Sequence, residues 1–423
     1  MTSVDLESRI AANAARLSAD LEAFAAISEP GDGVTRLAYT ALERRAHDVF
    51  AERMRTLGCV VHTDAAGNTI ADLPATEDNG PQSVVGTGSH LDSVAQGGRF
   101  DGIAGVVAGM EAAYLAALSP VPRRRRWRFV AFAAEEGARF GQACNGSRMV
   151  AGLTTLPDTR RLRDTEGVSM YDAMSEVGLR PDDLAADEWD AAQWHAFVEL
   201  HVEQGAVLED AGVPIGIVDS ISGSTRLHVA VNGTASHTGA TPMHKRRDAL
   251  VTAASCVLAG DRIAKDSAHH GTRVTVGRLE VSPGAMTTIP GRVEFVVDVR
   301  DIDSDRQRTT VEQLAAAYRD AADADGTAII VDVIADTSPV VLPAVVKDHL
   351  AAAAEQHGLG YRLLSSGASH DAQQVNKITP TGMIFVPSAG GLSHVPNEHT
   401  DADDLACGVD VLLAALYRLD ADE

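Results

Sequence analysis

The sequence predicts an α/β fold: a larger domain with a mixed, mostly parallel sheet flanked by helices, and an inserted smaller α+β domain with two helices on a four-stranded antiparallel sheet. The 423 residues exceed what one hydrophobic core usually serves. Buried apolar runs alternate with helical segments, which is typical of a helix-flanked sheet. Near residue 213 apolar and polar residues begin to alternate, as in half-exposed strands. We expect residues 1–212 and 337–423 to form the larger domain and residues 213–336 the inserted one.

The first part of the chain predicts two helices followed by buried strands. Apolar residues at helical spacing indicate one helix over "TSVDLESRIAANAARLSADLEAFAAI", with Ser3 or Asp5 as its cap. Another covers "LAYTALERRAHDVFAERMRTLG" and ends at Gly58. Two strands around a turn at Gly67 follow. The runs "SVVGTGSH" and "WRFVAFAAEE" then predict buried strands, and "IAGVVAGMEAAYLAAL" predicts the helix between them.

The inserted domain is predicted from the order strand, helix, strand, strand, helix, strand, which makes one compact unit. Its first strand is "PIGIVDSISGSTRLHVAVNGTA" and its last is "AIIVDVIAD". After about residue 336 the sequence again has the continuous apolar runs that are typical of the larger domain. We expect a helix over 343–357, a strand "GMIFVPS" and a final helix "DADDLACGVDVLLAALYRL".

Composition narrows the possible functions. The net charge of −23 disfavours binding to the phosphate backbone of nucleic acid. No apolar run approaches the ~20 residues that span a bilayer, and the N-terminus lacks the apolar core of a secretory signal. We therefore expect a cytoplasmic protein without a membrane or nucleic-acid partner. Four scattered cysteines predict neither a disulfide framework nor a structural zinc site: Cys59, Cys144, Cys256 and Cys407.

The stretch "GSHLDSVAQGGRFDG" carries candidate metal ligands. His90 follows a buried strand and should lie at its carboxyl end, where open α/β sheets place their ligands. Asp92 points to the same side and could hold the second ring nitrogen of His90, so we count it among the catalytic residues. Asp101 opens the next helix; taken alone, it reads as an N-cap.

Further candidates end the other apolar runs. Glu135 and Glu136 end the second buried strand, where adjacent carboxylates repel each other unless a cation stands nearby. Because neighbours in a strand face opposite ways, one could bind metal while the other faces the reacting water. The alternative is a charged loop end. His201 and His394 follow a third and a fourth apolar strand.

Together these residues predict a dinuclear metal centre. The predicted ligands are His90, Asp101, Glu136, His201 and His394, with Asp101 shared between two divalent ions. Imidazole and carboxylate ligands suit Zn²⁺ or Mn²⁺, and Co²⁺ as well. Such a centre lowers the pKa of a bridging water and polarises a carbonyl group. Glu135 would take the proton of that water and pass it to the leaving nitrogen.

The motifs around these residues resemble those of the dinuclear-metal amidohydrolases related to aminoacylases. The resemblance is greatest to the branch of N-carbamoyl-L-amino acid hydrolases, β-ureidopropionases and allantoate amidohydrolases. It covers almost the whole chain, and these motifs occur in order: "GSHLDSVAQGGRFDG", "EEGARF", "FVELHVEQG", "SHTGATPMHKRRDA", "IPGRVEFVVDVRD", "SHDAQ" and "GGLSHVPNE". The resemblance implies the same five ligands, with Asp101 bridging, and Glu135 as general acid and base.

The resemblance also implies substrate-binding residues. His237 would bind substrate and stabilise the tetrahedral oxyanion, commonly from the partner subunit of a dimer; without the family it reads as a turn histidine. Gln204 would contact the ureido group, and Arg300 would pair with a substrate carboxylate, although alone it reads as a surface strand arginine. Gly391 would let the backbone approach the substrate. His370, with Asp371, belongs to another family motif near the site.

One segment departs from the family pattern. Gly284 and Thr287 stand where the branch usually has asparagines, the second of which helps Arg300 hold the carboxylate. A threonine offers one hydroxyl donor where an amide offers two. A lost hydrogen bond to a charged group costs roughly 1.5–3 kcal/mol, which is about tenfold to a hundredfold in affinity. The usual substrate would then bind more weakly.

The expected function is metal-dependent hydrolysis of a linear amide C–N bond in an N-carbamoyl (ureido) amino acid, releasing the amino acid, CO₂ and ammonia. Alternatives are an allantoate or ureidoglycolate amidohydrolase, and an aminoacylase- or dipeptidase-like hydrolysis of an N-acyl amino acid. A non-catalytic binding protein is a further alternative, which Glu135 argues against because a binder needs no base. We also expect a homodimer formed by an edge strand and helix of the inserted domain, which closes over the small-molecule substrate.

Overall fold

The computed structural model describes residues 11–77 and 80–422, which form two compact units. One unit extends to Asp219 and resumes at Leu342, and the other is Ser220–Val341. The expected boundaries lay at residues 213 and 337. They differ because the alternating run after residue 213 is two strands, β6 (Ile215–Ile221) and β7 (Gly223–Asn232), which belong to different sheets. Alternation continues through both strands, so the pattern alone does not show the break.

The first unit is built on a mixed sheet whose central strands are parallel. Its order along the main path is β1-β2-β4-β3-β5-β15-β6-β13, and β14 also pairs with β6. The four central strands run parallel to one another: β4 (Trp127–Phe132), β3 (Val84–His90), β5 (Trp194–Val202) and β15 (Thr381–Val386). The others are β1 (Val60–Thr63), β2 (Thr69–Leu73) and β14 (Tyr361–Ser366), and the short end strand β13 (Val340–Val341) is formed by the last two residues counted in the second unit. The predicted fold class is confirmed.

Helices cover this sheet, and the most buried of them lies closest to the candidate ligands. Helix α4 (Ile103–Leu118) is apolar on nearly every side and packs against β3 and β5 of the sheet and against the neighbouring helix α13 (Ala402–Ala421). A Cβ on its Gly105 would lie 2.1 Å from the carbonyl oxygen of Leu200 in β5, so glycine is what allows this approach. The remaining helices are α2 (Ala14–Ala25), α3 (Ala41–Thr56), α5 (Asn145–Val150), α6 (Leu156–Arg161), α7 (Met170–Glu176), α8 (Val207–Ala211), α11 (Ala344–Gln356) and α12 (Asp371–Val375).

The helix caps follow local rules. Asn13 caps α2, and its side chain accepts the Arg16 backbone N–H. The expected caps Ser3 and Asp5 lie outside the described residues. Thr40 caps α3, which agrees with the predicted second helix. Among the described residues, the helices all fall short of the combined length and apolarity required to cross a bilayer.

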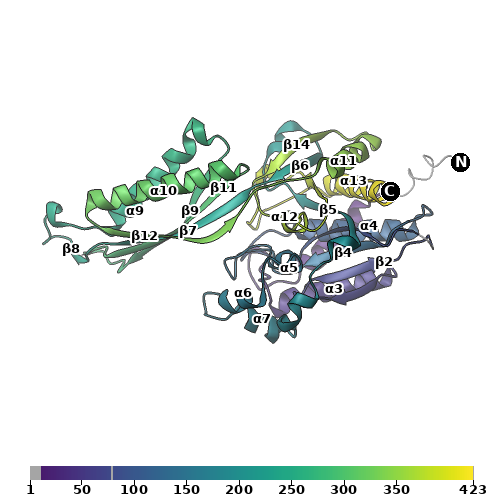
Figure 1. Cartoon of the computed structure of the whole chain (residues 1–423), viewed down its shortest axis with the longest axis horizontal. Coiled ribbons are helices and arrows are strands. Elements are labelled where there is room, and N and C mark those ends of the chain that lie inside the picture. The colour runs from purple at the N-terminus through teal and green to yellow at the C-terminus, as the bar shows by residue number, and fades with distance from the viewer. Residues whose placement is uncertain (1–10, 78–79, 423) are drawn as a thin grey trace. The chain divides into compact units, whose positions relative to one another are not determined.

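The second unit contains a four-stranded antiparallel sheet, as predicted, and its strand order is β12-β7-β11-β9. Its other strands are β9 (Arg273–Ser282), β11 (Arg292–Asp301) and β12 (Ala328–Thr337). Helices α9 (Ala249–Lys265) and α10 (Ser304–Asp325) pack on one face and bury residues such as Leu227, Phe295 and Tyr318 (Figure 1). A small ladder of β8 (Ser236–His237) and β10 (Thr288–Ile289) extends this unit.

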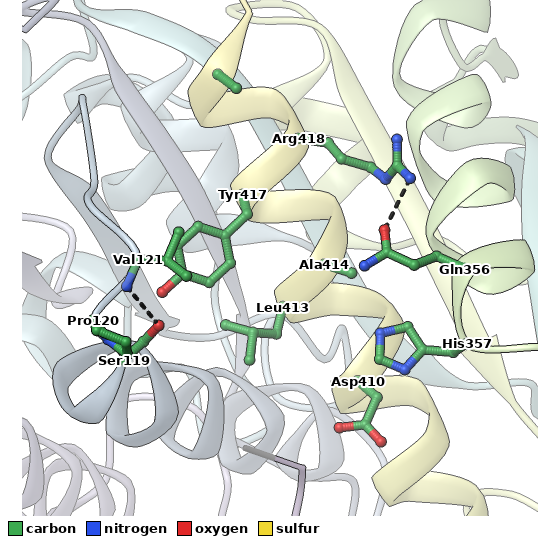
Figure 2. A pocket seen from close by; sticks show the side chains of 11 residues that line it. Ser119, Pro120, Val121, Gln356, His357, Asp410, Leu413, Ala414, Tyr417 and Arg418 are labelled. Carbon is green, nitrogen blue, oxygen red and sulfur yellow. Dashed lines mark hydrogen bonds between the residues drawn. The ribbon is translucent and has the colours of Figure 1, made fainter. Parts of the chain in front are cut away.

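A cavity of about 240 Å³ lies beside α13 in the first unit (Figure 2). Leu413 and Tyr417 of α13 form its apolar wall, and His357 follows α11 at its edge. None of the candidate metal or catalytic residues is among the side chains that line it. Candidate ligands lie instead at the carboxyl ends of the parallel strands β3 and β5.

Buried His47 of α3 gives a testable pH dependence. Its side chain is 1% exposed and its Nδ1 lies 2.9 Å from the Thr69 hydroxyl. Burial, followed by the charges of Arg44 and Arg36, lowers the pKa of His47 well below its ordinary value. The folded state keeps it neutral, whereas the unfolded chain protonates it below about pH 6.5. Stability is therefore lost as pH falls through that value, by up to about 1.4 kcal/mol per pH unit.

We expect the stability advantage of the wild type over His47→Gln to shrink by about 1 kcal/mol between roughly pH 7.5 and 5.5. Urea unfolding at both pH values measures it. His62→Gln, at an exposed position of β1, is the control. An unchanged difference between wild type and His47→Gln would contradict the neutral, buried state of His47.

Candidate metal centre

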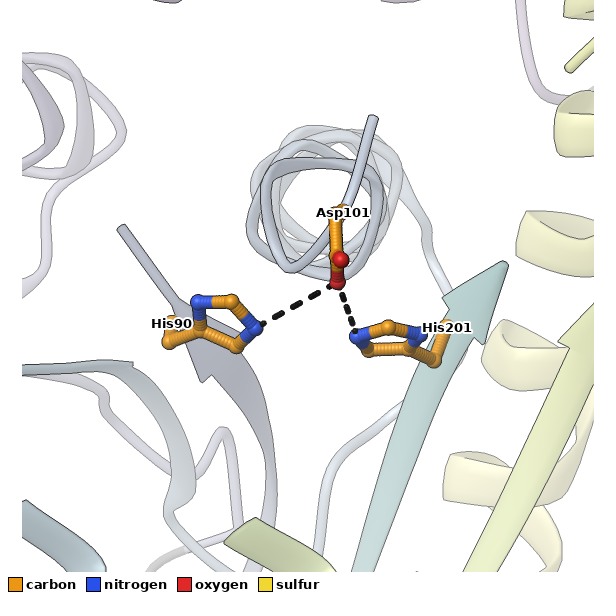
Figure 3. A group of neighbouring side chains, drawn as sticks. All are labelled: His90, Asp101 and His201. Carbon is orange, nitrogen blue, oxygen red and sulfur yellow. Dashed lines mark ion pairs between the residues drawn. The ribbon is translucent and has the colours of Figure 1, made fainter. Parts of the chain in front are cut away.

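Three predicted ligands meet at one point (Figure 3). The Nε2 atoms of His90 and His201 lie 3.7 Å and 3.1 Å from Oδ1 of Asp101, and all three side chains are buried. His90 is the last residue of β3 and His201 lies near the end of β5. Since these strands are parallel neighbours, their carboxyl ends share one edge of the sheet. Asp101 reaches that edge from the segment before α4.

A second group forms on the other oxygen of Asp101. Nε2 of His394 lies 3.0 Å from Oδ2 of Asp101 and 3.3 Å from Oε1 of Glu136. Asp101 thus offers one oxygen to each group: His90, Asp101 and His201 in the first, and Asp101, Glu136 and His394 in the second. This arrangement has the geometry expected of a shared ligand.

Asp101 is not a helix cap, so that alternative reading is wrong. The N-cap of α4 is Gly102, and no side chain caps the helix. Gly102 has a φ of 69°, and a Cβ there would lie 2.4 Å from Cε1 of His90. Only glycine allows the chain to turn this closely past the imidazole. The conformation directs Asp101 toward the ligands instead of back to its own helix.

The histidine ring orientations fit a divalent cation. Nδ1 of His90 lies 3.1 Å from the main-chain oxygen of Asp92, and Nδ1 of His201 lies 2.9 Å from that of Val202. A carbonyl oxygen can only accept, so each Nδ1 carries hydrogen. In the neutral rings the lone pair of Nε2 then faces the Asp101 carboxylate, with that of His201 also accepting the Gly102 N–H at 3.3 Å, and a cation beside them would bind both the nitrogens and the carboxylate. Burial alone would raise the pKa of Asp101, but if the rings are protonated instead, hydrogen bonds from His201, His394 and His90 hold it well below its ordinary value.

The loop after β4 brings both glutamates into the centre. Strand β4 ends at Phe132, so strand alternation does not orient Glu135 and Glu136. Instead the two carboxylate oxygens of Asp92 accept their backbone N–H groups, each at 2.9 Å. The Asp92 carboxylate lies 3.6 Å from Nδ1 of His90, whose hydrogen bond goes to the Asp92 main chain. Asp92 therefore orients both the imidazole and the loop.

Glu135 lies next to the first ligand group without belonging to it. Its Oε2 is 3.8 Å from Nε2 of His90, and its Oε1 accepts the Cys144 thiol at 3.0 Å. Burial raises the pKa of Glu135 well above its ordinary range; a positive charge on His90 would oppose this, and the carboxylates of Glu136 and Asp371 add to it. A carboxyl group so placed can accept and return a proton.

The sequence profile of peptidase family M20/M25/M40 matches residues 86–418. The chain belongs to this family. It is 40% identical over 409 residues to an N-carbamoyl-L-amino-acid amidohydrolase of Paenarthrobacter aurescens, covering 97% of this chain and 98% of the relative. An allantoate amidohydrolase of Escherichia coli is 37% identical, with 93% and 94% covered. The crystal structure of AtUAH in complex with glyoxylate superimposes with a TM-score of 0.91 at 32% identity, over 99% and 100% of the chains.

These findings confirm the predicted family and the predicted reaction class, hydrolysis of a C–N bond other than a peptide bond. The M20 family is metal-dependent, in agreement with the two groups of ligand side chains.

Sequence reasoning missed a residue that positions Asp101 in this M20 centre. Glu398 accepts the backbone N–H groups of Phe100 and Asp101, each at 2.9 Å, and the hydroxyl of Ser393 at 2.7 Å. It lies in the motif "GGLSHVPNE", yet follows no strand end, so only the motif itself could have pointed to it.

Three predicted substrate residues lie in the first unit: Gln204, His370 and Gly391. Nε2 of Gln204 donates to Oδ2 of Asp101 at 2.9 Å, and its buried Oε1 has no hydrogen-bond partner among the described residues. The His370 ring packs edge-on against His201 with centroids 4.6 Å apart, and its Nε2 contacts the Ser366 hydroxyl at 2.8 Å. Gly391 has a φ of 65° and approaches the backbone of Ala206 closely.

Three more predicted residues lie in the second unit. His237 of β8 accepts the backbone N–H groups of Gly239 and Ala240 with Nδ1, at 3.0 Å and 3.1 Å. Thr287 accepts the Thr238 backbone N–H through its carbonyl oxygen. Nε of Arg300 in β11 pairs with Oδ2 of Asp298 at 2.7 Å. His237 thus has the contacts of a turn histidine, and both of these hydrogen bonds are accepted by its Nδ1 atom.

Proposed function

We propose that this M20 amidohydrolase hydrolyses the linear amide C–N bond of an N-carbamoyl amino acid to the amino acid, CO₂ and ammonia. The observation that carries the proposal is Asp101 shared by two ligand groups with the buried Glu135 carboxyl beside them. The N-carbamoyl-L-amino-acid amidohydrolase of Paenarthrobacter aurescens, 40% identical over 97% of this chain, supports the choice of substrate.

The proposed centre holds two divalent ions, Zn²⁺ or Mn²⁺, with Co²⁺ also suited to the ligands. His90, His201 and Asp101 would hold one, and Glu136, His394 and Asp101 the other. When bound, the ions supply Lewis acidity for the carbonyl group and a lower pKa for the attacking water.

The remaining steps belong to this chain's own side chains. Glu135 accepts the proton of the attacking water at a carboxylate oxygen and delivers it to the leaving nitrogen. Asp92 keeps that carboxyl group in place through the two backbone N–H groups it accepts. The free Oε1 of Gln204 accepts an N–H of the ureido group, since it lacks another hydrogen-bond partner among the described residues.

In this proposal the substrate carboxylate and the oxyanion are bound by residues of the second unit. Arg300 pairs with the substrate carboxylate, with Thr287 where the branch usually has asparagine. His237 stabilises the oxyanion through Nε2, because Nδ1 is engaged by its own turn. Gly391 and His370 shape the wall of the site. We propose a homodimer in which His237 serves the partner subunit; a fully active monomer in light scattering would contradict it.

Allantoate is the second candidate substrate. It is supported by the 37% identity to the allantoate amidohydrolase of Escherichia coli and by Thr287, which departs from the usual carboxylate-binding pattern.

A substrate panel tests the proposal. We expect the purified protein, stripped with chelator, to be inactive and to regain ammonia release from N-carbamoyl amino acids when Mn²⁺, Zn²⁺ or Co²⁺ is restored. Allantoate and N-acetyl amino acids are assayed beside them. If allantoate is turned over faster than the N-carbamoyl amino acids, allantoate is the substrate and not an N-carbamoyl amino acid. Turnover of N-acetyl amino acids alone, or full activity without metal, would overturn the proposed function.

A further inference from the structure

We propose that Glu43 is a positioning residue for the loop that carries Glu135 and Glu136. The inference deepens the proposed function and rests on it for the catalytic role of Glu135. Glu43 lies in the first turn of α3, far from the ligands along the chain, and its side chain is fully buried.

The sequence around Glu43 looks like an ordinary helix start, but its carboxylate is used differently. Thr40 caps α3 and its hydroxyl accepts the Glu43 backbone N–H at 3.3 Å. In a capping box the glutamate three residues on would return to the backbone N–H of Thr40. Here Oε2 of Glu43 accepts the N–H of Tyr39 at 2.6 Å and Oε1 accepts that of Ala134 at 2.8 Å. One carboxylate thus ties the start of α3 to the loop after β4.

Both residues held by Glu43 have left-handed backbones. Tyr39 has a φ of 52° and Ala134 a φ of 55°. For a residue other than glycine this conformation costs roughly 1–2 kcal/mol and persists only where the surroundings enforce it. A hydrogen bond from each of these N–H groups to a buried carboxylate supplies that enforcement.

The Ala134 contact belongs to a continuous clamp on the loop. Glu43 accepts the N–H of Ala134, and Asp92 accepts those of Glu135 and Glu136. Three successive N–H groups are therefore held by two carboxylates. On the carbonyl side, the backbone N–H of Asn145 binds the Ala134 oxygen at 2.9 Å. Without Glu43 the Ala134 peptide can leave the left-handed region, and the Glu135 carboxyl turns with it.

Catalysis is sensitive to such a displacement, because about 1 Å of misplacement can cost about a hundredfold in rate. Substrate binding is not affected in the same way, since Glu43 touches neither ligand side chains nor the predicted substrate residues by any described hydrogen bond. The proposal therefore predicts an effect on kcat and little on KM.

Glu43→Gln is the primary test, since the amide has the same shape but only one acceptor oxygen for two N–H groups. We expect kcat to fall by about ten- to a hundredfold, with KM within about threefold at saturating metal. Glu43→Asp keeps the charge and shortens the reach, so it should lower kcat similarly. A crystal structure of Glu43→Gln should show Ala134 outside the left-handed region.

Asp420→Asn is the matched control. Asp420 is a buried carboxylate that accepts the backbone N–H groups of Arg124 and Arg125, at 2.7 Å and 2.9 Å, just before β4 begins. The Asp420→Asn variant should have a lower melting temperature than the wild type, with kcat within about twofold of the wild-type value. If Glu43→Gln lowers the melting temperature like this control and leaves kcat unchanged, Glu43 is only structural and the proposal fails. If the wild type lacks amidohydrolase activity, the proposed function fails, and the Ala134 backbone in the variant structure still decides the positioning role.

Discussion

Glu135→Gln is expected to lower kcat by about 10²–10⁴-fold, the usual range for a lost general acid–base group. The amide cannot carry the proton from the attacking water to the leaving nitrogen. KM and bound metal should change little, because Glu135 belongs to neither ligand group. Steady-state kinetics with each substrate of the panel, together with metal content by elemental analysis, measure the effect.

Glu111→Gln serves as the matched control for Glu135. Glu111 is also a buried glutamate of the first unit, but it pairs with Arg16. This variant should keep wild-type turnover. Wild-type kcat in Glu135→Gln would remove Glu135 from the mechanism and show that another group moves the proton.

Asp101→Asn is expected to reduce bound metal from two ions toward none and to lower kcat by more than about a hundredfold. Each carboxylate oxygen of Asp101 faces a different ligand group, and an amide replaces one of them with an NH₂ group. The neutral side chain also removes the one negative charge that both ions would share. Elemental analysis after dialysis and kinetics at saturating Mn²⁺ measure the two effects. Retention of two ions by the variant would show that Asp101 does not bridge them.

Sequence could predict those site residues that lie at the ends of buried strands. His90 and His201 end parallel neighbouring strands, and the apolar runs before them are visible in the sequence. Strand alternation was the wrong argument for Glu135 and Glu136, because β4 ends before them and Asp92 orients their backbone. The N-cap reading of Asp101 failed because Gly102 takes that position.

The supporting carboxylates could not be predicted from sequence. Glu398 accepts N–H groups from residues almost three hundred positions earlier, and Glu43 accepts one 91 positions later. Every residue except proline has a backbone N–H, so the residue type of the donor gives no signal in the sequence that predicts these contacts. The division between the units was missed by a few residues for a similar reason, since β6 and β7 share one alternating pattern.

The discontinuous course of the first unit has a consequence for biosynthesis. Asp101 and Ser393, which are hydrogen-bonded to each other, are separated by 292 positions, and the whole second unit is translated between them. A nascent chain emerging from the ribosome cannot complete the second ligand group until His394 has been made. Bound ions would then link the segment that carries Asp101 to the segment that carries His394, as a cross-link that closes a very long loop does. Loading with metal should therefore protect the C-terminal helix from proteolysis as well as switch on turnover.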